Sequence, residues 1–402
     1  MSRCLQGKHI LLGLTGGIAC YKSAELVRLL VREGADVHVL MTPAAQQFLT
    51  PLTLQSLSGN SVATDLFSLS EELHVGHIRL ADLADAYLIA PATADVVAKL
   101  AQGNADDVVT TVALATRAPL LVAPSMNVNM YEHPAVQENL ERLARRGVRV
   151  IPAAEGELAC GWHGKGRLAE PPVLLAEVER AVTPPVFAGE RIVVTAGPTR
   201  EFLDPVRFLT NRSSGKMGFA LAAAAWRRGA EVMLVSGPVS LPTPHGVARR
   251  NVVSAAEMYE AVADEFSRAT MLVMCAAVAD YRPAVCQPTK VKKQSKGWTL
   301  ELQPTIDILA SLKPQKGNRF VVGFAAETDQ VEEFGREKLE RKGLDLVVAN
   351  DVSRPEAGME ADMNAAILLD RFGGRIELPL MNKADLAEAI LDRIAELRQR
   401  TA

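Results

Sequence analysis

The same opening pattern occurs twice in this 402-residue chain. An apolar run at residues 9–14 is followed by a loop, an amphipathic stretch that ends at Gly34, and a second apolar run at residues 36–41. The order of strand, loop, helix and strand starts again at residues 191–195, and its helix ends at Gly229. Apolar strands separated by helices predict parallel sheets that helices cover on both faces. The fold class is therefore α/β, with two Rossmann-like three-layer domains.

Two prolines and a glycine mark the best candidate linker, in the segment from Thr183 to Gly189. A chain of 402 residues is also too long for one typical hydrophobic core, so two domains are expected. We therefore predict a first domain over residues 1–183, a linker over residues 184–190 and a second domain over residues 191–402.

The remaining elements follow from the same hydrophobic periodicity. In the first domain, strands are predicted at 86–90, 119–123 and 149–151, and helices at 18–33, 75–84, 94–101, 106–116, 134–146 and 174–182. In the second domain, strands are predicted at 231–235, 271–276 and 344–348, helices at 217–228, 255–268, 331–341 and 384–398, and a hairpin of two strands at 366–370 and 375–378.

Charge and cysteine content narrow the class of protein. The formal net charge of -3 gives no reason to expect nucleic-acid or membrane-surface binding. Five widely separated cysteines form neither a disulfide framework nor a zinc pattern, which fits a reducing compartment. No uninterrupted apolar span is long enough to cross a bilayer. We expect a cytoplasmic protein.

The strand ends of the first half are typical of a mononucleotide site. The glycines after the first strand, Gly16 and Gly17, do not form the Gly-x-Gly-x-x-Gly fingerprint, and Thr42 stands where an acidic ribose ligand would be expected, which argues against NAD. Hydroxyl side chains recur at successive strand ends and suit a phosphate and a flavin ring: Thr15, Thr42, Thr93, Thr110 and Thr111. A single threonine is more often a helix cap than a ligand contact.

A glycine-rich segment surrounds Cys160. Glycines stand at 156, 161, 164 and 166, and Lys165 and Arg167 follow the cysteine closely. Such a segment is predicted to be a loop rather than a strand or a helix, because each glycine loses entropy and packing there. The two cations favour a thiolate that could give or take a proton. Spacing alone leaves open a surface loop with an inert cysteine.

Several first-half motifs resemble the homo-oligomeric flavin-containing cysteine decarboxylases, which include phosphopantothenoylcysteine decarboxylase. The resemblance covers nearly all of residues 8–182 and rests on these segments: His77-Ile-Arg-Leu, Ala90-Pro-Ala-Thr-Ala-Asp95, Gly103-Asn-Ala-Asp-Asp107, Pro124-Ser-Met-Asn-Val-Asn-Met130 and the Cys160 segment. It implies a flavodoxin-like domain that binds FMN, with Gly16, Gly17, Thr42, Thr93 and Thr110 among the cofactor contacts.

The resemblance also implies an oxidative decarboxylation. In that family, FMN oxidises a cysteinyl thiol, CO2 leaves, and the electrons return to the resulting enethiolate. His77 matches the family's essential histidine, Asn127 the asparagine that holds the substrate carboxylate, and Cys160 the proton donor. Trp162 and Leu168 depart from the family pattern at positions that bear on substrate contacts rather than on the reaction.

Three cationic groups in the second half indicate a polyphosphate ligand. The segment from Gly197 to Gly218 places hydroxyls, amides and Lys216 before a predicted helix, although it lacks the Walker pattern. The other two groups are Lys290, Lys292, Lys293 and Lys296, and the helical i, i+4 pair Lys338 and Lys342. Each group could also be only a solvated charge cluster. Together they suggest a triphosphate.

Second-half motifs resemble phosphopantothenate–cysteine ligase, which in bacteria is fused behind the decarboxylase. They are Thr195-Ala-Gly-Pro-Thr199, Asp204-Pro-Val-Arg207, Asn211-Arg-Ser-Ser-Gly-Lys-Met-Gly218, Ala276-Ala-Val-Ala-Asp-Tyr281, Lys290-Val-Lys-Lys293, Gly323-Phe-Ala-Ala-Glu-Thr328 and Ala349-Asn-Asp351. The resemblance implies that CTP converts the carboxylate of 4'-phosphopantothenate to an acyl-cytidylate with Mg2+, and that cysteine then displaces CMP. The residues alone leave CTP or ATP open.

The ligase resemblance assigns roles to individual residues. Asn211 matches the residue that handles the acyl-cytidylate, and Lys290 the residue that serves its conversion. Positions that match the CTP site are Met274, Cys275, Ala276, Asp280, Ile306, Asp307, Ile308, Leu309, Phe324, Lys338 and Lys342. Thr305 and Ile306 separate Pro304 from Asp307, where the family commonly has Pro-Asp-Ile, so the metal ligands stay unassigned.

The favoured interpretation is a bifunctional enzyme of coenzyme A biosynthesis that acts on 4'-phosphopantothenate, cysteine and CTP. The resemblance implies a homo-oligomer with trimeric decarboxylase domains and dimeric ligase domains. Alternative interpretations are a single-function flavoprotein decarboxylase, a flavin-binding regulatory protein with a nucleotide-binding second domain, and a two-domain nicotinamide dehydrogenase. The missing dinucleotide fingerprint argues against the dehydrogenase, and the presence of His77, Asn127 and Cys160 argues against the regulatory protein.

Overall fold

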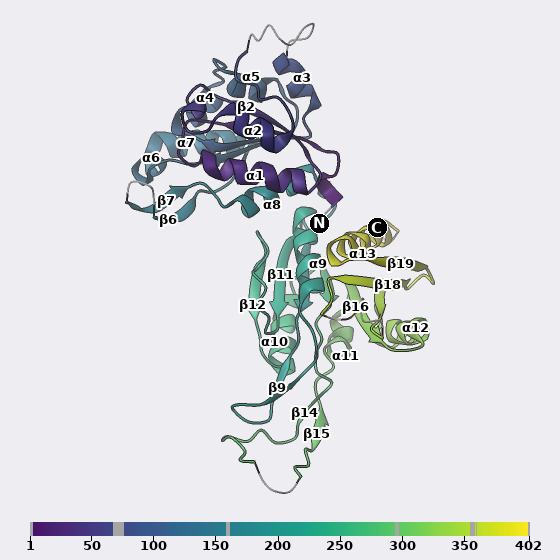
Figure 1. Cartoon of the computed structure of the whole chain (residues 1–402). Coiled ribbons are helices and arrows are strands. Elements are labelled where there is room, and N and C mark those ends of the chain that lie inside the picture. The colour runs from purple at the N-terminus through teal and green to yellow at the C-terminus, as the bar shows by residue number, and fades with distance from the viewer. Residues whose placement is uncertain are drawn as a thin grey trace. The chain divides into compact units, whose positions relative to one another are not determined.

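The computed structural model describes residues 3–66, 76–157, 161–293, 297–353, 358 and 360–400. The chain separates into two compact units between Pro184 and Pro185, a point inside the predicted linker (Figure 1). Each unit has its own main sheet and its own hydrophobic clusters. Within the described part of the chain, no helix combines the length and the apolar character needed to cross a membrane.

The N-terminal unit contains a five-stranded parallel sheet in the order β2-β1-β3-β4-β5. Its strands are β1 (His9–Leu14), β2 (Asp36–Met41), β3 (Ala86–Ala92), β4 (Leu120–Pro124) and β5 (Arg149–Val150). This order is that of the flavodoxin-like doubly wound fold, in which ligands bind at the carboxyl ends of the strands where the winding reverses. The predicted fold class is confirmed.

Alternation along each strand builds two cores in this unit. Leu12 and Leu88 pack in one cluster, whereas their neighbours Leu11 and Tyr87 pack in another on the opposite face. The first cluster includes residues of α1 (Cys20–Arg32), α2 (Pro51–Ser58) and α8 (Pro171–Val182). The second includes residues of α3 (Gly76–Leu83), α4 (Ala94–Gln102), α5 (Val108–Ala115) and α7 (Pro134–Arg145).

The prediction of an irregular glycine-rich loop was wrong. Two antiparallel strands, β6 (Ala154–Glu157) and β7 (His163–Arg167), form a hairpin there. Gly164 and Gly166 have φ angles of +157° and +149°, which glycine adopts and residues with a side chain rarely do. The glycines therefore permit a strand instead of preventing one. Residues 158–160, including Cys160, lie outside the described residues.

The C-terminal unit contains an eight-stranded sheet in the order β12-β11-β8-β13-β16-β17-β18-β19. The strands from β12 to β17 are parallel, and the last two pairs are antiparallel. Their bounds are β8 (Arg191–Ala196), β11 (Glu231–Ser236), β12 (Ala248–Asn251), β13 (Met271–Met274), β16 (Phe320–Glu327), β17 (Leu346–Asp351), β18 (Met363–Asp370) and β19 (Arg375–Asn382). The predicted hairpin is confirmed as β18 and β19.

Helices cover both faces of this second sheet. Val193 of β8 packs in a cluster with α10 (Ala255–Phe266), α11 (Ile308–Leu312) and α12 (Val331–Lys342). Ala196, on the other face of β8, meets Gly218 of α9 (Lys216–Arg227) so closely that an added Cβ on Gly218 would lie 2.6 Å from the Ala196 Cβ. Helix α13 (Lys383–Gln399) packs against α9.

Two small hairpins extend this unit beyond its main sheet (Figure 1). One joins β9 (Arg200–Phe202) to β10 (Phe208–Thr210), and the other joins β14 (Tyr281–Pro283) to β15 (Leu302–Pro304). The second hairpin brackets the basic segment that starts at Lys290. Neither hairpin was predicted, because strands of three residues carry too short an apolar pattern to recognise.

Candidate functional site

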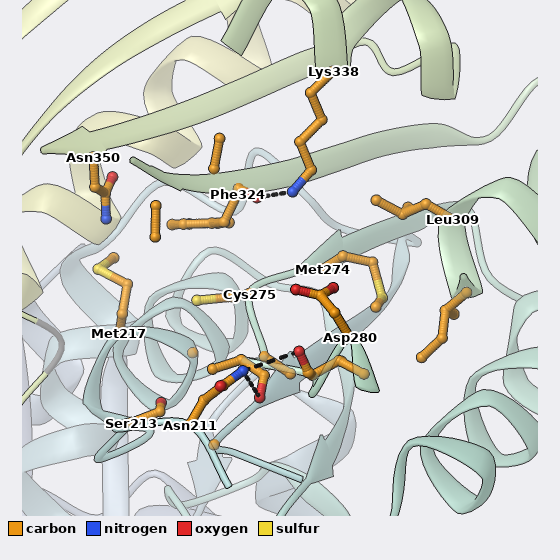
Figure 2. A pocket seen from close by; sticks show the side chains of 18 of the residues that line it. Asn211, Ser213, Met217, Met274, Cys275, Asp280, Leu309, Phe324, Lys338 and Asn350 are labelled. Carbon is orange, nitrogen blue, oxygen red and sulfur yellow. Dashed lines mark hydrogen bonds between the residues drawn. The ribbon is translucent and has the colours of Figure 1, made fainter. Parts of the chain in front are cut away.

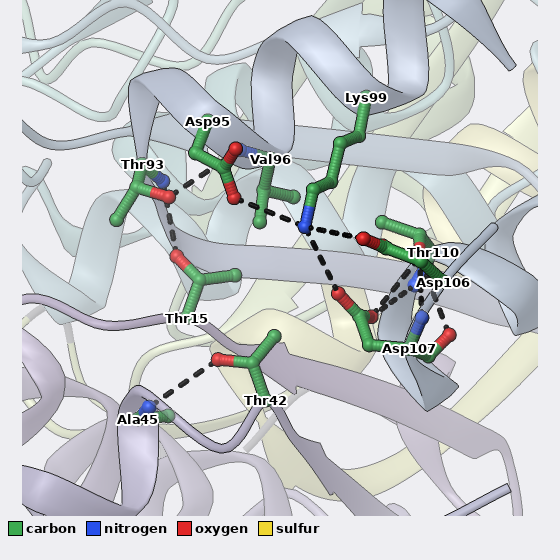
Figure 3. Close-up of polar contacts among 10 residues, drawn as sticks. All are labelled: Thr15, Thr42, Ala45, Thr93, Asp95, Val96, Lys99, Asp106, Asp107 and Thr110. Carbon is green, nitrogen blue, oxygen red and sulfur yellow. Dashed lines mark hydrogen bonds and ion pairs between the residues drawn. The ribbon is translucent and has the colours of Figure 1, made fainter. Parts of the chain in front are cut away.

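Thr15 links two loops at the carboxyl ends of the first sheet. Its hydroxyl donates to the Pro91 carbonyl at 2.7 Å and accepts from the Thr93 N–H at 3.0 Å. Thr93 in turn caps α4 by accepting from the Val96 N–H at 3.4 Å (Figure 3). These bonds hold the loop after β1 against the loop after β3. The winding of the sheet reverses between these two strands, β1 and β3.

Thr42 and Thr110 also cap local structure, whereas the buried Thr111 hydroxyl has no hydrogen-bond partner among the described residues. Thr42 accepts from the Ala45 N–H at 3.2 Å. Thr110 and Asp107 form a capping box at the start of α5, in which the Thr110 N–H donates to Asp107 at 2.9 Å. Gly16 allows a close approach of neighbouring loops, since an added Cβ would lie 2.5 Å from the Ala44 Cβ. The hydroxyls at these strand ends therefore shape the loops.

A lysine and three aspartates join α4 to the start of α5 (Figure 3). Lys99 Nζ lies 3.2 Å from Asp95, 3.0 Å from Asp106 and 3.9 Å from Asp107. The hydrogen bond to Asp106 raises the pKa of Lys99 above its ordinary value. Asp107 is the N-cap of α5 and accepts from the Thr110 N–H, so this network fixes the position of a predicted cofactor-binding residue. The sequence prediction did not include it.

His77 carries a buried polar atom that lacks a hydrogen bond within the described part of the chain. It lies on α3, and its Nδ1 is buried without a hydrogen bond to any residue that the structure describes. Buried polar atoms are almost always paired, so an unpaired one calls for an explanation such as a ligand or a catalytic role.

Asn127 caps α6 (Val128–Glu132), with its side-chain oxygen accepting from the Asn129 N–H at 2.9 Å. The segment before it is tied to the glycine-rich hairpin, because the Met126 N–H donates to the Gly166 carbonyl at 2.9 Å. The strand that follows residues 158–160, β7, therefore packs beside Asn127. The position of Cys160 itself is not described, so its predicted proximity to His77 and Asn127 stays a prediction.

The C-terminal unit has a cavity of about 560 Å³ at the carboxyl ends of its parallel strands (Figure 2). Pockets for small molecules and cofactors commonly have volumes of roughly 300–1,000 Å³. The cavity brings together the predicted second-half residues other than Lys290: Asn211, Met274, Cys275, Ala276, Asp280, Ile306, Asp307, Ile308, Leu309, Phe324, Lys338 and Lys342. Lys290 is exposed and is not among the lining residues.

The two helical lysines of the cavity are held differently. Lys338 donates to the Phe324 carbonyl at 2.6 Å, and burial lowers its pKa although Glu327 and Asp280 oppose that shift. Lys342 forms an ion pair with Asp307. Asp307 also caps α11, so Lys342 is anchored to the start of that helix. Both lysines come from α12 and place positive charge at the cavity wall.

Asn211, which directly follows β10, also lines the cavity (Figure 2). Its amide nitrogen donates to the carbonyls of Val278 at 3.1 Å and Ala277 at 3.4 Å, in the loop after β13. Figure 2 also shows the Cys275 thiol in the lining. Burial raises the pKa of that thiol to about 12, so it stays protonated near neutral pH.

Several cavity residues were missed by sequence reasoning. Lys383 and Asn364 line the cavity, although they are only 6% and 4% exposed. Burial and then the charge of Lys216 lower the pKa of Lys383. No spacing in the sequence links these positions to the earlier motifs, because the antiparallel strand β18 and helix α13 bring them there. Asn350, a further lining residue, stood within a recognised motif and could have been included.

Comparisons with known proteins cover both units. The family model described as "Flavoprotein" matches residues 1–183. The model described as "DNA/pantothenate metabolism flavoprotein C-terminal domain" matches residues 187–397. Among solved structures, the C-terminal domain of a coenzyme A biosynthesis bifunctional protein CoaBC is 41% identical, covers 54% of this chain and 99% of that chain, and has a TM-score of 0.47. A PPC decarboxylase mutant complexed with pantothenoylaminoethenethiol is 30% identical, covers 43% and 97%, and has a TM-score of 0.40.

Full-length relatives are named coenzyme A biosynthesis bifunctional protein CoaBC. The Vibrio cholerae protein is 51% identical over 395 residues, which are 98% of this chain and 99% of the relative. The Bacillus subtilis protein is 49% identical over 401 residues, with 99% of each chain covered. The Escherichia coli K12 protein is 49% identical over 396 residues, with 97% of each covered. This chain therefore belongs to the CoaBC family of bifunctional coenzyme A biosynthesis proteins, with an N-terminal flavoprotein domain.

Proposed function

We propose that this bifunctional enzyme of coenzyme A biosynthesis joins 4'-phosphopantothenate to cysteine and then decarboxylates the product to 4'-phosphopantetheine. The observation that carries the proposal is the cavity of the C-terminal unit. It gathers residues far apart in the sequence, from Asn211 to Lys383, into one pocket with Lys338, Lys342 and Lys383 on its wall. A small-molecule site with that charge suits an anionic nucleotide and an anionic acid.

The ligase half uses CTP in this proposal. The carboxylate of 4'-phosphopantothenate attacks the α-phosphorus and releases pyrophosphate, and the amine of cysteine then displaces CMP to form the amide. Both steps develop negative charge on phosphate oxygens, which Lys338, Lys342 and Mg2+ would offset. Asn211 would contact the acyl-cytidylate, and Lys290 would serve its conversion. Asp280 and Phe324 belong to the same nucleotide site.

The decarboxylase half takes FMN in this proposal, and the residues present fit that cofactor. An added Cβ on Gly17 would meet only a Pro91 atom at 3.9 Å, so space is open beside the loop after β1. The exposed fractions of Ile18 and Met130 are 61% and 49%, so both apolar side chains are available to contact an apolar ring. Gly16, Gly17, Thr42, Thr93 and Thr110 would hold the cofactor, which supplies the redox chemistry when bound.

The chain itself would bind the substrate and handle the protons. His77, whose Nδ1 has no partner among the described residues, would hold a proton during the oxidation and decarboxylation stage. The Asn127 amide would orient the substrate carboxylate before CO2 leaves. Cys160 would then donate a proton to the enethiolate product, as its position beside Lys165 and Arg167 in the sequence suggests.

We further propose a homo-oligomer in the cytoplasm, with trimeric decarboxylase domains and dimeric ligase domains. The family resemblance supports the symmetry, and the five separated cysteines support a reducing compartment. Light scattering of the purified chain would measure the assembly. A monomer at working concentration would contradict this part of the proposal.

One assay tests the two activities together. Purified chain is supplied with 4'-phosphopantothenate, cysteine and either CTP or ATP, and pyrophosphate and CO2 are followed in the same reaction. We expect both products with CTP, with pyrophosphate appearing first. Release of CO2 from added 4'-phosphopantothenoylcysteine without any nucleotide-dependent pyrophosphate would instead indicate a single-function decarboxylase.

A further inference from the structure

Three side chains that can bind metals meet at the N-terminal ends of β1 and β2. Asp36 and His38 lie two residues apart on β2 and therefore share a face of the sheet. His9, the first residue of β1, pairs in register with Asp36. One nitrogen of each histidine and one oxygen of the aspartate all lie within 4.8 Å of one another. We propose that His9, Asp36 and His38 bind a divalent transition-metal cation such as Zn2+.

The distances in this cluster resemble those around a tetrahedral zinc ion. His9 Nδ1 and His38 Nε2 lie 3.0 Å and 3.1 Å from the same atom, Oδ2 of Asp36. Ligand atoms at about 2.0–2.1 Å from a tetrahedral Zn2+ are separated by roughly 3.3 Å. An ion could therefore enter with shifts of a few tenths of an ångström along these two edges. It would replace the protons that now join the ring nitrogens to the carboxylate.

A supporting contact orients the carboxylate. Asn60 Nδ2 donates to the other oxygen of Asp36, Oδ1, at 2.6 Å and to the Val37 carbonyl at 3.0 Å. Oδ1 is thereby engaged, and Oδ2 faces the two histidines. Metal-binding carboxylates are commonly held by such outer contacts, which fix the ligand before the ion arrives.

The cluster is accessible to ions and water. The side chains of His9, Asp36 and His38 are 35%, 42% and 18% exposed. Three protein ligands with a position open to solvent form a common arrangement for Zn2+. The neighbouring cation Lys8 is paired with Asp85 at 2.8 Å, so its charge is partly offset there.

This site is separate from the proposed flavin crevice. His9 and Asp36 begin the strands that Thr15 and Thr42 follow. A strand of six residues spans about 20 Å at roughly 3.3 Å per residue, so the two sites lie at opposite ends of the same strands. A cation here would tie β1, β2 and the turn at Asn60 together, and would stabilise the N-terminal unit without touching the reacting groups.

Metal titration of the full-length protein tests the proposal. The purified chain is stripped with a chelator, freed of the chelator and titrated without nucleotide, with Zn2+ by calorimetry and with Co2+ by visible absorption. We expect wild type to bind a cation at this site. Asn60→Ala, which removes only the supporting amide, should weaken binding about tenfold, and His38→Asn or Asp36→Asn by more than about 100-fold.

A matched histidine variant controls for non-specific binding. His133 accepts a hydrogen bond from the Ala135 N–H at the start of α7, and asparagine preserves that cap. His133→Asn should keep wild-type Zn2+ affinity. Zn2+ should also raise the melting temperature of wild type and of His133→Asn, and not that of His38→Asn, because only a folded site binds the ion.

Two outcomes would overturn the site. One is failure of wild type to bind Zn2+ or Co2+, and the other is equal affinity in wild type, Asp36→Asn and His38→Asn. If either of those variants does not fold, the Zn2+ affinities of Asn60→Ala and His9→Gln are compared with that of wild type instead. An unchanged affinity in both of these folded variants would also reject the proposal.

Discussion

Lys338 is a partly buried cation at the wall of the cavity. Its ammonium group donates to the Phe324 carbonyl at the cavity wall, and burial lowers its pKa. A lysine is charged below its pKa, so a lowered pKa means that the charge is lost at a lower pH than in an exposed lysine. If the proposed triphosphate site is correct, nucleotide binding should weaken over that lower pH range.

Lys338→Arg tests this dependence on charge. Arginine stays charged throughout, so the alkaline loss of CTP affinity should move to higher pH in this variant. The measurement is the KM for CTP from pyrophosphate release between about pH 7 and 10, in wild type and variant. Lys8→Arg, which changes a lysine of the N-terminal unit that is paired with Asp85, serves as the control. Superimposable profiles for wild type and Lys338→Arg would remove Lys338 from the triphosphate site.

Asp204 holds the segment that carries Lys290. Its fully buried carboxylate accepts from the N–H groups of Val206, Arg207 and Val291 at 2.8, 2.9 and 3.2 Å. Arg207 in turn donates to the Val291 carbonyl at 3.1 Å. Desolvation alone would raise the pKa of Asp204, but the backbone donors and Arg207 outweigh it and lower the pKa. The N–H and the carbonyl of Val291, the residue after Lys290, are thus both hydrogen-bonded.

Asp204→Asn should reduce ligation while sparing decarboxylation. The change removes the charge that holds Arg207, and a displaced Lys290 should lower the ligase kcat/KM by about 10- to 100-fold. Pyrophosphate release and CO2 release from added 4'-phosphopantothenoylcysteine give the two readouts. Asp264→Asn, which breaks an exposed ion pair with Arg250, is the matched control. Equal losses in both variants would rule out a specific role for Asp204.

At the scale of elements, the β6–β7 hairpin depends on a close approach that only glycine allows. An added Cβ on Gly166 would lie 2.3 Å from the carbonyl oxygen of Met126, a backbone atom that cannot rotate away. The same glycine accepts the Met126 N–H. The strand that follows Cys160 is therefore packed against the segment of Asn127 by close backbone contacts at Gly166.

Gly166→Ala should loosen that packing and slow decarboxylation. Overpacking of this kind costs about 1–3 kcal/mol, in addition to the cost of a positive φ. Gly147→Ala is the control, because Gly147 also has a positive φ of +87° but an added Cβ there meets nothing within 4 Å. Thermal unfolding and CO2 release would be measured for both. Identical behaviour of the two variants would contradict the role of the contact.

At the scale of the whole molecule, two units with separate cores carry separate candidate sites. His77 and Asn127 belong to the first unit, and the cavity with Lys338 belongs to the second. A substitution that affects only one site should therefore leave the chemistry of the other intact, provided that both units stay folded.

Paired variants test this separation. Lys338→Ala should abolish most nucleotide-dependent pyrophosphate release and keep CO2 release from added 4'-phosphopantothenoylcysteine. His77→Gln should do the reverse. Both reactions are followed for each protein, and flavin content and thermal unfolding check that each is folded. Loss of both activities in one folded variant would show that the two sites depend on each other.

The sequence predicted those elements whose hydrophobic pattern lies within a few neighbouring residues. The bounds of β1 and β2 agree with the predicted strands at 9–14 and 36–41, and the β18–β19 hairpin lies where the pattern placed it. These segments have apolar periodicity and glycine turns within a few residues. Strand β16 was missed because Gly323 interrupts its apolar run, although that glycine fits beside Leu344 in the core.

By itself, the sequence determined the α/β class, the two-part order and the motifs that match the family, because these depend on neighbouring residues. Only the tertiary structure decided that the glycine-rich segment forms a hairpin, that Lys383 and Asn364 line the nucleotide-sized cavity, and that His9, Asp36 and His38 meet. The physical reason is that these contacts depend on strand register and on elements distant in the chain. Hydrophobic periodicity records which face of an element is buried, but not which distant element packs against that face.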